Sequence, residues 1–197
     1  MDNTNTPSLV LASGSLYRRQ LLARLQLPFE VAAPDIDETA LPDESASKRA
    51  ERLAIEKAQA LVRQFPRHWI IGSDQVAELH GQHLGKPGNR ENAIKQLSAC
   101  SGQAVHFHTG LCVLNSKTGI PLSCAETFTV QFRTLSTPEI ERYIDAEKPY
   151  DCAGSFKSEG LGISLFTAFA GRDPNALVGL PLMALCDMLR QEGIVVP

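Results

Sequence analysis

Short apolar runs alternate with helical stripes along most of the chain. Buried strands are predicted where apolar runs end in turn residues, at 8–12, 29–32 and 69–71. Amphipathic helices are predicted at 16–25, 46–65, 89–98, 137–146 and 181–192. Two longer runs, 103–115 and 122–132, are expected to pair as antiparallel strands through the turn at 115–119. This alternation with one antiparallel hairpin indicates an α/β fold with a mixed sheet.

Length and charge narrow the classes of protein that this chain could represent. Its 197 residues allow one domain, or two lobes that share a cleft, and we expect a single domain over residues 1–197. Lys plus Arg is 19 and Asp plus Glu is 22, which gives a formal net charge of -3. Proteins that bind long nucleic acids usually carry a basic surplus, so no nucleic acid polymer is expected as a partner.

The sequence also predicts where the protein is found. No apolar run approaches the roughly 18 residues of a membrane span, and the first residues lack the pattern of a signal peptide. The five cysteines are widely spaced and form no CxxC pair, so neither a disulfide framework nor a zinc knuckle is predicted. We therefore expect a cytoplasmic protein with reduced thiols and no membrane partner.

Two cations interrupt the apolar faces of predicted helices. At 100° per residue, Lys57 falls inside the apolar arc that contains Leu53. Its ammonium group therefore either extends along the rim to water or meets an anion. Arg18 belongs to the stripe of Leu21 and Leu22, and it lies in a first helical turn, where the macrodipole disfavours a cation.

The turn before the first helix offers partners for an anion. Ser13 and Ser15 supply hydroxyls there, and the start of the helix leaves backbone N–H groups free. An anion shared by these groups and Arg18 would explain the inward arginine, and an exposed, frayed first turn is the alternative. Two inward cations beside such a turn favour a phosphate ligand.

Carboxylates accompany these cations. Asp74 follows the third predicted strand in a Gly-Ser turn, where open sheets commonly place ligand groups, although a turn or helix cap is the alternative. Asp35, Asp37 and Glu38 form either a solvated acidic loop or a set of oxygen ligands, which suit Mg²⁺ or Mn²⁺. Lys86, in a turn between glycine and proline, is either another cation of the site or a surface lysine.

Other candidate motifs are weak. His106 and His108 alternate on one strand face, but no third metal ligand is evident. The glycine pairs do not match the phosphate-binding loop GxxxxGK[ST], and no GxSxG motif of a serine hydrolase is present.

Several segments occur in a known order: LVLASGSLYRRQLL, DIDET, AIEKAQAL with Lys57, IIGSDQV, LGKP, CAGSFKSEG and DPNALVGLPL. In order and spacing, the chain resembles the Maf family of nucleoside triphosphate pyrophosphatases over essentially its whole length. The combination of SDQV with GSFKSEG is similar to the branch called 7-methyl-GTP pyrophosphatase (YceF-like).

The resemblance implies two lobes around a central cleft, a fold related to the inosine triphosphate pyrophosphatases, and a homodimer. It implies Mg²⁺- or Mn²⁺-dependent cleavage between the α- and β-phosphates, which yields a nucleoside monophosphate and pyrophosphate. It places substrate phosphate binding on Ser13, Arg18, Lys57 and Lys86, and metal binding on Glu38 and Asp74. Asp74 is also the expected proton acceptor for the attacking water.

Base specificity is expected from Tyr17, Gln75 and Glu159, where the dTTP/UTP branch usually carries Arg, Thr and Gln. Methylation at N7 makes guanine cationic, an aromatic ring attracts a flat cation, and a carboxylate accepts hydrogen bonds from guanine N–H groups. Tyr17 and Glu159 therefore suit 7-methylguanine. Gln75 either reads a base edge or braces the turn at Asp74.

The expected function is hydrolysis of 7-methyl-GTP to 7-methyl-GMP and pyrophosphate, as a house-cleaning reaction against modified nucleotides. One alternative is a dTTP/UTP or broad canonical-nucleotide pyrophosphatase. Another is a non-catalytic nucleotide-binding regulator of septum formation. The intact set of charged residues favours an enzyme over the regulator.

Overall fold

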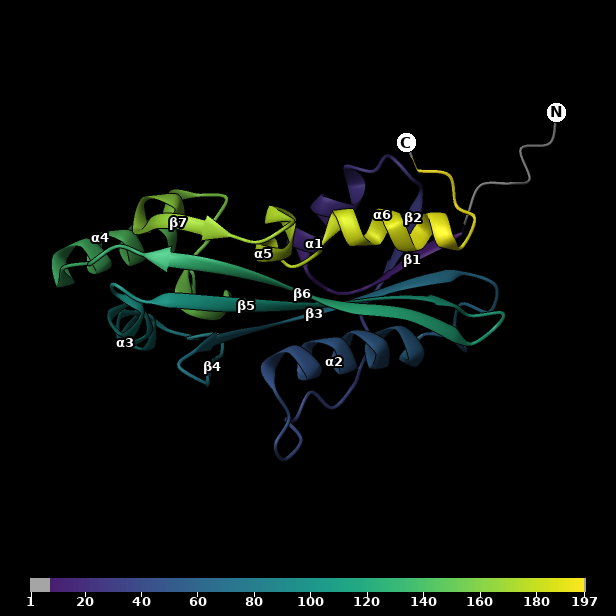
Figure 1. Ribbon diagram of the computed structural model, residues 1–197, viewed down its shortest axis with the longest axis horizontal. Coiled ribbons are helices and arrows are strands. Elements are labelled where there is room, and N and C mark those ends of the chain that lie inside the picture. Colours follow the sequence, from purple (N-terminus) through teal and green to yellow (C-terminus); the bar gives the residue numbers. More distant parts are fainter. Residues whose placement is uncertain (1–7, 197) are drawn as a thin grey trace.

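A seven-stranded mixed sheet forms the centre of the protein in the computed structural model, which describes residues 8–196 (Figure 1). Its strands are β1 (Leu9–Ala12), β2 (Phe29–Ala32), β3 (Trp69–Leu79), β4 (Gln82–Leu84), β5 (Ala104–Asn115), β6 (Ile120–Phe132) and β7 (Phe166–Ala170). Their order is β2-β1-β3-β5-β6-β7, and β4 pairs with β3. The strands β2, β1 and β3 are parallel, whereas β3, β5, β6 and β7 pair antiparallel.

Helices cover both faces of this sheet. They are α1 (Leu16–Ala23), α2 (Ala46–Ala60), α3 (Arg90–Cys100), α4 (Thr137–Glu147), α5 (Pro174–Val178) and α6 (Leu182–Gln191), with short 3-10 turns at Ala153–Ser155 and Leu161–Leu165. In Figure 1, α2 lies under β3, β5 and β6, while α1, α5 and α6 lie on the opposite face. The mixed α/β fold and the antiparallel hairpin predicted from the sequence are therefore confirmed.

Several element boundaries were predicted wrongly. The third strand, predicted at 69–71 with Asp74 after it, continues through Asp74 to Leu79, because its second half pairs with β5, where Asp74 lies opposite Gly110. The α2 helix ends at Ala60 and the chain continues as turns, so the predicted helix over 46–65 is too long. The short elements β4, β7 and α5 were not predicted.

The α2 helix packs unusually close to the sheet because two strand glycines face it. A Cβ atom at Gly72 would overlap the carbonyl oxygen of Ala54, and one at Gly110 would overlap that of Ala50. Backbone on backbone contact of this kind requires residues without a side chain. The glycines thus set the depth at which the inward side chains of α2 meet the strands.

Two apolar clusters lie on either side of the molecule's centre. One combines β1, α1 and α6, and is built around Leu11, Leu22 and Leu189. The other combines the far halves of β5 and β6 with α3 and α4, and includes Phe107 and Ile140.

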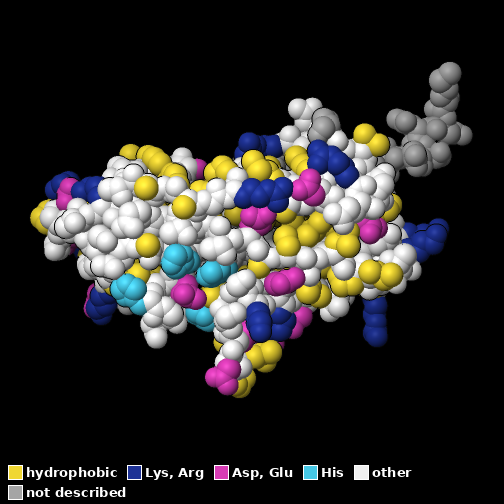
Figure 2. Space-filling model, viewed as in Figure 1, with side chains coloured by type: hydrophobic (Ala, Val, Ile, Leu, Met, Phe, Trp, Pro, Cys, Tyr) yellow, Lys and Arg dark blue, Asp and Glu magenta, His cyan; other side chains and the backbone are white. Residues whose placement is uncertain are grey.

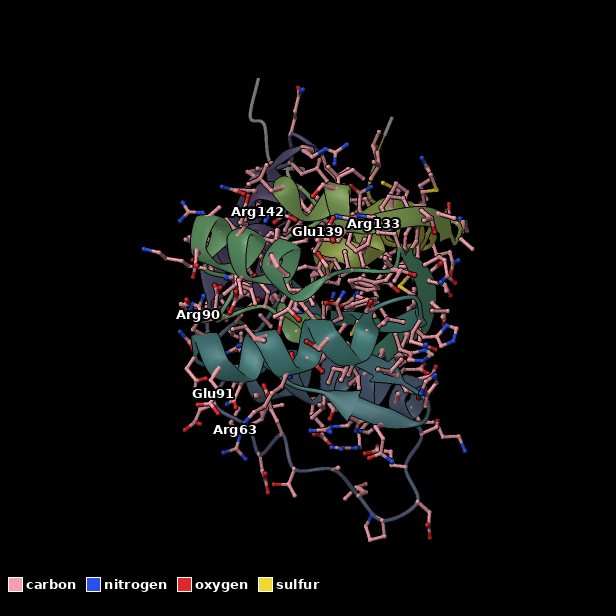
Figure 3. The ribbon with its side chains drawn as sticks, turned by 90° about the vertical axis from the view of Figure 1, so that its left-hand side faces the viewer. Arg63, Arg90, Glu91, Arg133, Glu139 and Arg142 are labelled. Carbon is pink, nitrogen blue, oxygen red and sulfur yellow. The ribbon has the colours of Figure 1, made fainter. Side chains whose placement is uncertain are left out.

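The end view in Figure 3 shows α3 and α4 side by side, where Arg90 of α3 donates to Asp145 of α4 at 2.6 Å. Neither cluster includes the residues predicted to bind phosphate or metal.

The predicted domain limits, residues 1 and 197, fall outside the described part of the chain. Within residues 8–196, no helix has the length and apolar character needed to cross a membrane.

Candidate active site

A cleft of about 890 Å³ lies between the two apolar clusters, and its walls come from distant parts of the chain. Every residue given a site role in the sequence analysis lines it: Ser13, Tyr17, Arg18, Glu38, Lys57, Asp74, Gln75, Lys86 and Glu159. Asp35 and Asp37, the other acids of the predicted cluster, are not among the lining residues, and Asp37 instead accepts two hydrogen bonds from Thr39.

The register of the parallel strands brings the first parts of this site together. Ala12, the last residue of β1, lies opposite Gly72 of β3. The turn that begins at Ser13 therefore lies beside Ser73 and Asp74. The parallel register sets the end of β1 beside the middle of β3, which explains why two sequence segments far apart supply one site.

Lys57 lies at the centre of the charged part of the cleft. Its Nζ donates to Oδ1 of Asp74 at 2.6 Å and lies 2.7 Å from Oε1 of Glu38. The Lys57 side chain is only 10% exposed. Of the two interpretations of Lys57, the structure shows the one in which the inward ammonium group meets an anion rather than extending to water. The anions are the protein's own carboxylates, and the close approach of α2 at Gly110 makes the contact possible.

The two carboxylates differ in their surroundings. Asp74 is buried, whereas the Glu38 side chain is 56% exposed at the mouth of the cleft. The hydrogen bond from Lys57 lowers the pKa of Glu38, and the charges of Lys57, Lys86 and Arg18 lower it further, against a smaller opposing effect of burial. Glu38 is therefore ionised at neutral pH. Asp74 uses Oδ1 for Lys57, which leaves Oδ2 for another partner.

Arg18 enters the cleft from the first turn of α1. Ser15 caps this helix by accepting a hydrogen bond from the Arg18 backbone N–H, and the Ser15 N–H in turn donates to the buried Ser13 hydroxyl. The Arg18 Nε donates to the carbonyl oxygen of Gly179 at 2.7 Å, which fixes the guanidinium group. Burial lowers the pKa of Arg18, while the charges of Asp74 and Glu38 raise it.

Residues 173–182, the segment DPNALVGLPL, form a scaffold behind the site. Asp173 is fully buried and its carboxylate accepts from the backbone N–H groups of Asn175 and Met183 at 2.8 Å. Gly179 has a φ of 113°, in the region that favours glycine, and its carbonyl oxygen accepts from Arg18 and from Ser73. This segment therefore orients the cleft residues through its backbone.

The same scaffold holds the side chain of Gln75. Its amide nitrogen donates to the carbonyl oxygens of Ala176 and Leu177 and to the hydroxyl of Thr109, at 2.8–3.1 Å. That nitrogen is committed to bracing α5 against β3. Gln75 lines the cleft, and only its amide oxygen is left for a ligand.

The other end of the cleft is formed by Tyr17 and the segment 151–159. Burial raises the pKa of Tyr17 to about 12, with further contributions from Cys152, Asp151 and Glu159. The phenol is therefore neutral at physiological pH and lies near two carboxylates. Glu159 is exposed and accepts a hydrogen bond from the Ser158 hydroxyl at 3.1 Å.

Two cations of the cleft wall were not predicted. The Nη2 of Arg49 donates to the backbone carbonyl of Glu38 at 2.9 Å, and its Nη1 lies 3.1 Å from His83. Its Nε is buried without a hydrogen-bond partner. Lys157 donates to the carbonyl oxygen of Glu147. Helical periodicity missed Arg49 because a long side chain at the start of α2 reaches around the helix end.

A group of histidines gathers over β4 and β5 (Figure 2), with His83 on β4 and His106 and His108 on β5. His106 and His108 each contact a threonine hydroxyl of β6 through Nδ1, at 2.9 and 3.0 Å. Across residues 8–196, no group of three or more His, Cys, Asp or Glu side chains is arranged to hold a metal ion.

The cleft thus combines clustered cations, two adjacent carboxylates and an aromatic end, which is an arrangement suited to a nucleotide. The Maf-like protein family model matches residues 8–192, and the chain belongs to this family. A relative from Pseudomonas savastanoi pv. phaseolicola named 7-methyl-GTP pyrophosphatase is 57% identical, over 97% of this chain and 100% of its own length. A relative of the same name from Alcanivorax borkumensis is 58% identical over 98% of both chains.

Solved structures with low sequence identity share the fold. The Ham1 protein of Staphylococcus aureus superposes with a TM-score of 0.54 at 14% identity, covering 94% of this chain and 99% of that one. A HAM1 protein from Coxiella burnetii gives a TM-score of 0.52 at 15% identity, with the same coverage. At such identities the likeness shows the fold alone.

Proposed function

We propose that this protein hydrolyses 7-methyl-GTP to 7-methyl-GMP and pyrophosphate. The observation that carries the proposal is the similarity, over nearly the full length of both chains, to relatives named 7-methyl-GTP pyrophosphatase at 55–58% identity. The charge distribution of the cleft supports it, because cations are available for a triphosphate and an aromatic, acidic end for a cationic base. In this proposal the chain acts as one domain, and the cleft between the two apolar clusters is its single site.

The reaction that we propose depends on a divalent metal, Mg²⁺ or Mn²⁺. Glu38 and Asp74 fit such an ion, because both carboxylates contact one Lys57 nitrogen and therefore lie close together at the cleft. Mg²⁺ in nucleotide enzymes is typically held by one or two carboxylates together with substrate phosphates, which is the donor set available here. When bound, the ion would neutralise phosphate charge and polarise the reacting phosphoryl group.

The chain's own residues perform the remaining steps. The free Oδ2 of Asp74 accepts a proton from water as the water oxygen attacks the α-phosphorus. The bond between the α-phosphorus and its bridging oxygen breaks, and the electron pair leaves on pyrophosphate. Arg18, Lys57 and Lys86 neutralise the triphosphate and the charge that develops on the leaving group, with Ser13 holding the phosphate turn.

At the other end, the Tyr17 ring and the Glu159 carboxylate receive the base. A methylated guanine carries a positive charge that an aromatic face attracts, and Glu159 accepts from its N–H groups. The amide oxygen of Gln75, whose nitrogen is held by α5, is available to a base edge.

A substrate panel tests the proposed function. Pyrophosphate release is measured from 7-methyl-GTP, GTP, dTTP and UTP, each with Mg²⁺, with Mn²⁺ and with a chelator. We expect the highest kcat/KM for 7-methyl-GTP and no turnover with the chelator. A preference for dTTP or UTP would assign the protein to the other branch, and nucleotide binding without turnover would support a regulator.

We further propose a homodimer in the cytoplasm. The family resemblance supports the dimer, and five free cysteines support a reducing compartment. Light scattering coupled to gel filtration tests the assembly, since a monomeric mass at micromolar concentration would contradict it.

A further inference from the structure

The segment between α4 and the 3-10 turn at 153–155 carries a carboxylate that the proposed mechanism does not use. Helix α4 ends at Glu147, and the next residue, Lys148, has a φ of 47°, which turns the chain sharply. Two backbone hydrogen bonds, from Cys152 to Pro149 and from Gly88 to Tyr150, fix the segment that follows. Asp151 is thereby held on the wall of the cleft, beside Tyr17 and Glu159.

The charges at the two ends of the cleft are compensated differently. At the phosphate end, Glu38 and Asp74 share the Lys57 ammonium group. Asp151 forms no salt bridge among the described residues: it accepts from the Cys152 thiol, at 3.5 Å, and Glu159 accepts only from Ser158.

The nearby cation, Lys157, donates its hydrogen bond to a backbone carbonyl instead. Lys157 keeps its positive charge, so this end of the cleft carries two carboxylates that form no ion pair against one ammonium group, a net negative charge beside the Tyr17 ring.

This distribution selects the chemistry of the ligand portion bound there. A phosphate would be repelled by two unpaired carboxylates, and a neutral base would gain little from them. A flat organic cation gains from the ring and from both charges.

We infer that Asp151 is a specificity-determining residue that recognises the positive charge of the substrate base, an inference that rests on the proposed function. Asp151 acts through charge over a distance, whereas Glu159 accepts hydrogen bonds from the base edge.

The effect of Asp151 on substrate preference can be separated from the effect of the methyl group on the base. In 7-deaza-7-methyl-GTP a carbon replaces N7, so the methyl group keeps its place while the base is neutral. The test compares kcat/KM for 7-methyl-GTP and for this analogue in the wild-type protein and in Asp151→Asn. Asp43→Asn is the matched control, because Asp43 is an exposed acid outside the cleft lining and its substitution changes the net charge equally.

We expect the wild-type protein to prefer the cationic nucleotide. In Asp151→Asn, this preference should fall about three- to tenfold, mainly through a higher KM for 7-methyl-GTP. The kcat/KM for the neutral analogue should stay within about twofold of wild type, and Asp43→Asn should keep the full preference. Raising the salt concentration should lower the wild-type preference and have less effect on Asp151→Asn.

The outcomes separate the inference from the proposed function. If Asp151→Asn retains the wild-type preference, or loses activity on both nucleotides equally, the inference is wrong while the proposed function stands. If wild-type protein turns over 7-methyl-GTP but does not distinguish it from the neutral analogue, base charge is not read at all. If it releases no pyrophosphate from 7-methyl-GTP, the proposed function fails, and the inference with it.

Discussion

Lys57 shows how one residue links stability to the chemistry of the cleft. A buried ammonium group without a partner is strongly unfavourable, and two carboxylates held close together repel each other. The ion pairs to Glu38 and Asp74 resolve both problems at once, at 2.7 and 2.6 Å. A bound metal and triphosphate would introduce new charges next to Lys57, Glu38 and Asp74, so these three side chains are expected to exchange partners when substrate binds.

Substitution of Asp74 by asparagine tests its role as proton acceptor. The amide would keep the shape of the side chain but could not accept a proton from water, so kcat for 7-methyl-GTP should fall by about 10²- to 10⁴-fold. Pyrophosphate release with saturating Mg²⁺ measures this, and thermal unfolding checks that the variant is folded. Asp35→Asn, in an exposed acid outside the cleft lining, is the control and should be unaffected. Near-normal turnover in Asp74→Asn would rule out the assignment.

At the scale of elements, the packing of α2 on the sheet positions the site. Gly72 and Gly110 allow the helix backbone to touch β3 and β5, and Lys57 then reaches Asp74 on the strand beside it. On the opposite face, α5 and the glycine that ends it supply backbone carbonyls that fix Arg18 and Gln75. The cleft is therefore held by close backbone contacts on both sides of the sheet.

Adding a single methyl group at Gly110 should disturb this arrangement. In Gly110→Ala, the new Cβ atom would overlap the Ala50 carbonyl oxygen, so α2 must move outward. We expect the free energy of unfolding in urea to fall by about 2–3 kcal/mol, and kcat/KM to fall because Lys57 is displaced. Gly85→Ala is the control for stability, since its Cβ would meet nothing within 4 Å. Unchanged stability in Gly110→Ala would contradict the close packing described here.

The start of α4 predicts a pH dependence of stability. Hydrogen bonds from Ser136 hold the pKa of Glu139 at about 2, below its ordinary 4.5, and Arg133 contributes further (Figure 3). A carboxylate with a lowered pKa stabilises the folded state above its unfolded pKa, and this stabilisation is lost as pH falls through the folded value. Glu139→Gln should therefore lower the urea midpoint at pH 7, and the difference from wild type should shrink as pH falls from 4.5 towards 2.

For the whole molecule, the cleft exists only because strands distant in sequence become neighbours. The order β2-β1-β3-β5-β6-β7 places the turn after β1 beside Asp74, and the chain returns after α4 to close the base end. The same organisation buries two of the five cysteines: Cys100 lies in the cluster of α3 and α4, and Cys112 lies in a further apolar cluster between the sheet and α2; burial raises the pKa of each to about 12.

The reactivity of the thiols should report this burial. In the native protein, Cys100 and Cys112 should not react with a disulfide reagent at neutral pH, because the reactive thiolate is almost absent and the sulfur is inaccessible. We expect at most three thiols to react before unfolding and all five to react in denaturant. Replacing both buried cysteines by alanine should leave the native count unchanged. A native count above three would show that one of these clusters opens readily.

Much of the local structure, and the identity of the charged residues, followed from the sequence alone. Apolar periodicity located the main helices and the hairpin, because burial of one face imposes its period on the sequence. It also marked Arg18 and Lys57, since a charge on an apolar face violates that period. The family resemblance supplied Glu38 and Lys86, which pattern alone left open between site and surface.

How these residues meet depends on the tertiary structure. Asp74 lies within a long strand rather than at its end, because pairing with β5 extends β3 past the polar residues. Arg49 and Asp151 line the cleft although no pattern in the sequence marks them, and the Gln75 amide nitrogen is committed to α5, about 100 residues further along the chain. Such contacts leave no periodic trace in the sequence, because they depend on strand order and on how closely the backbones approach.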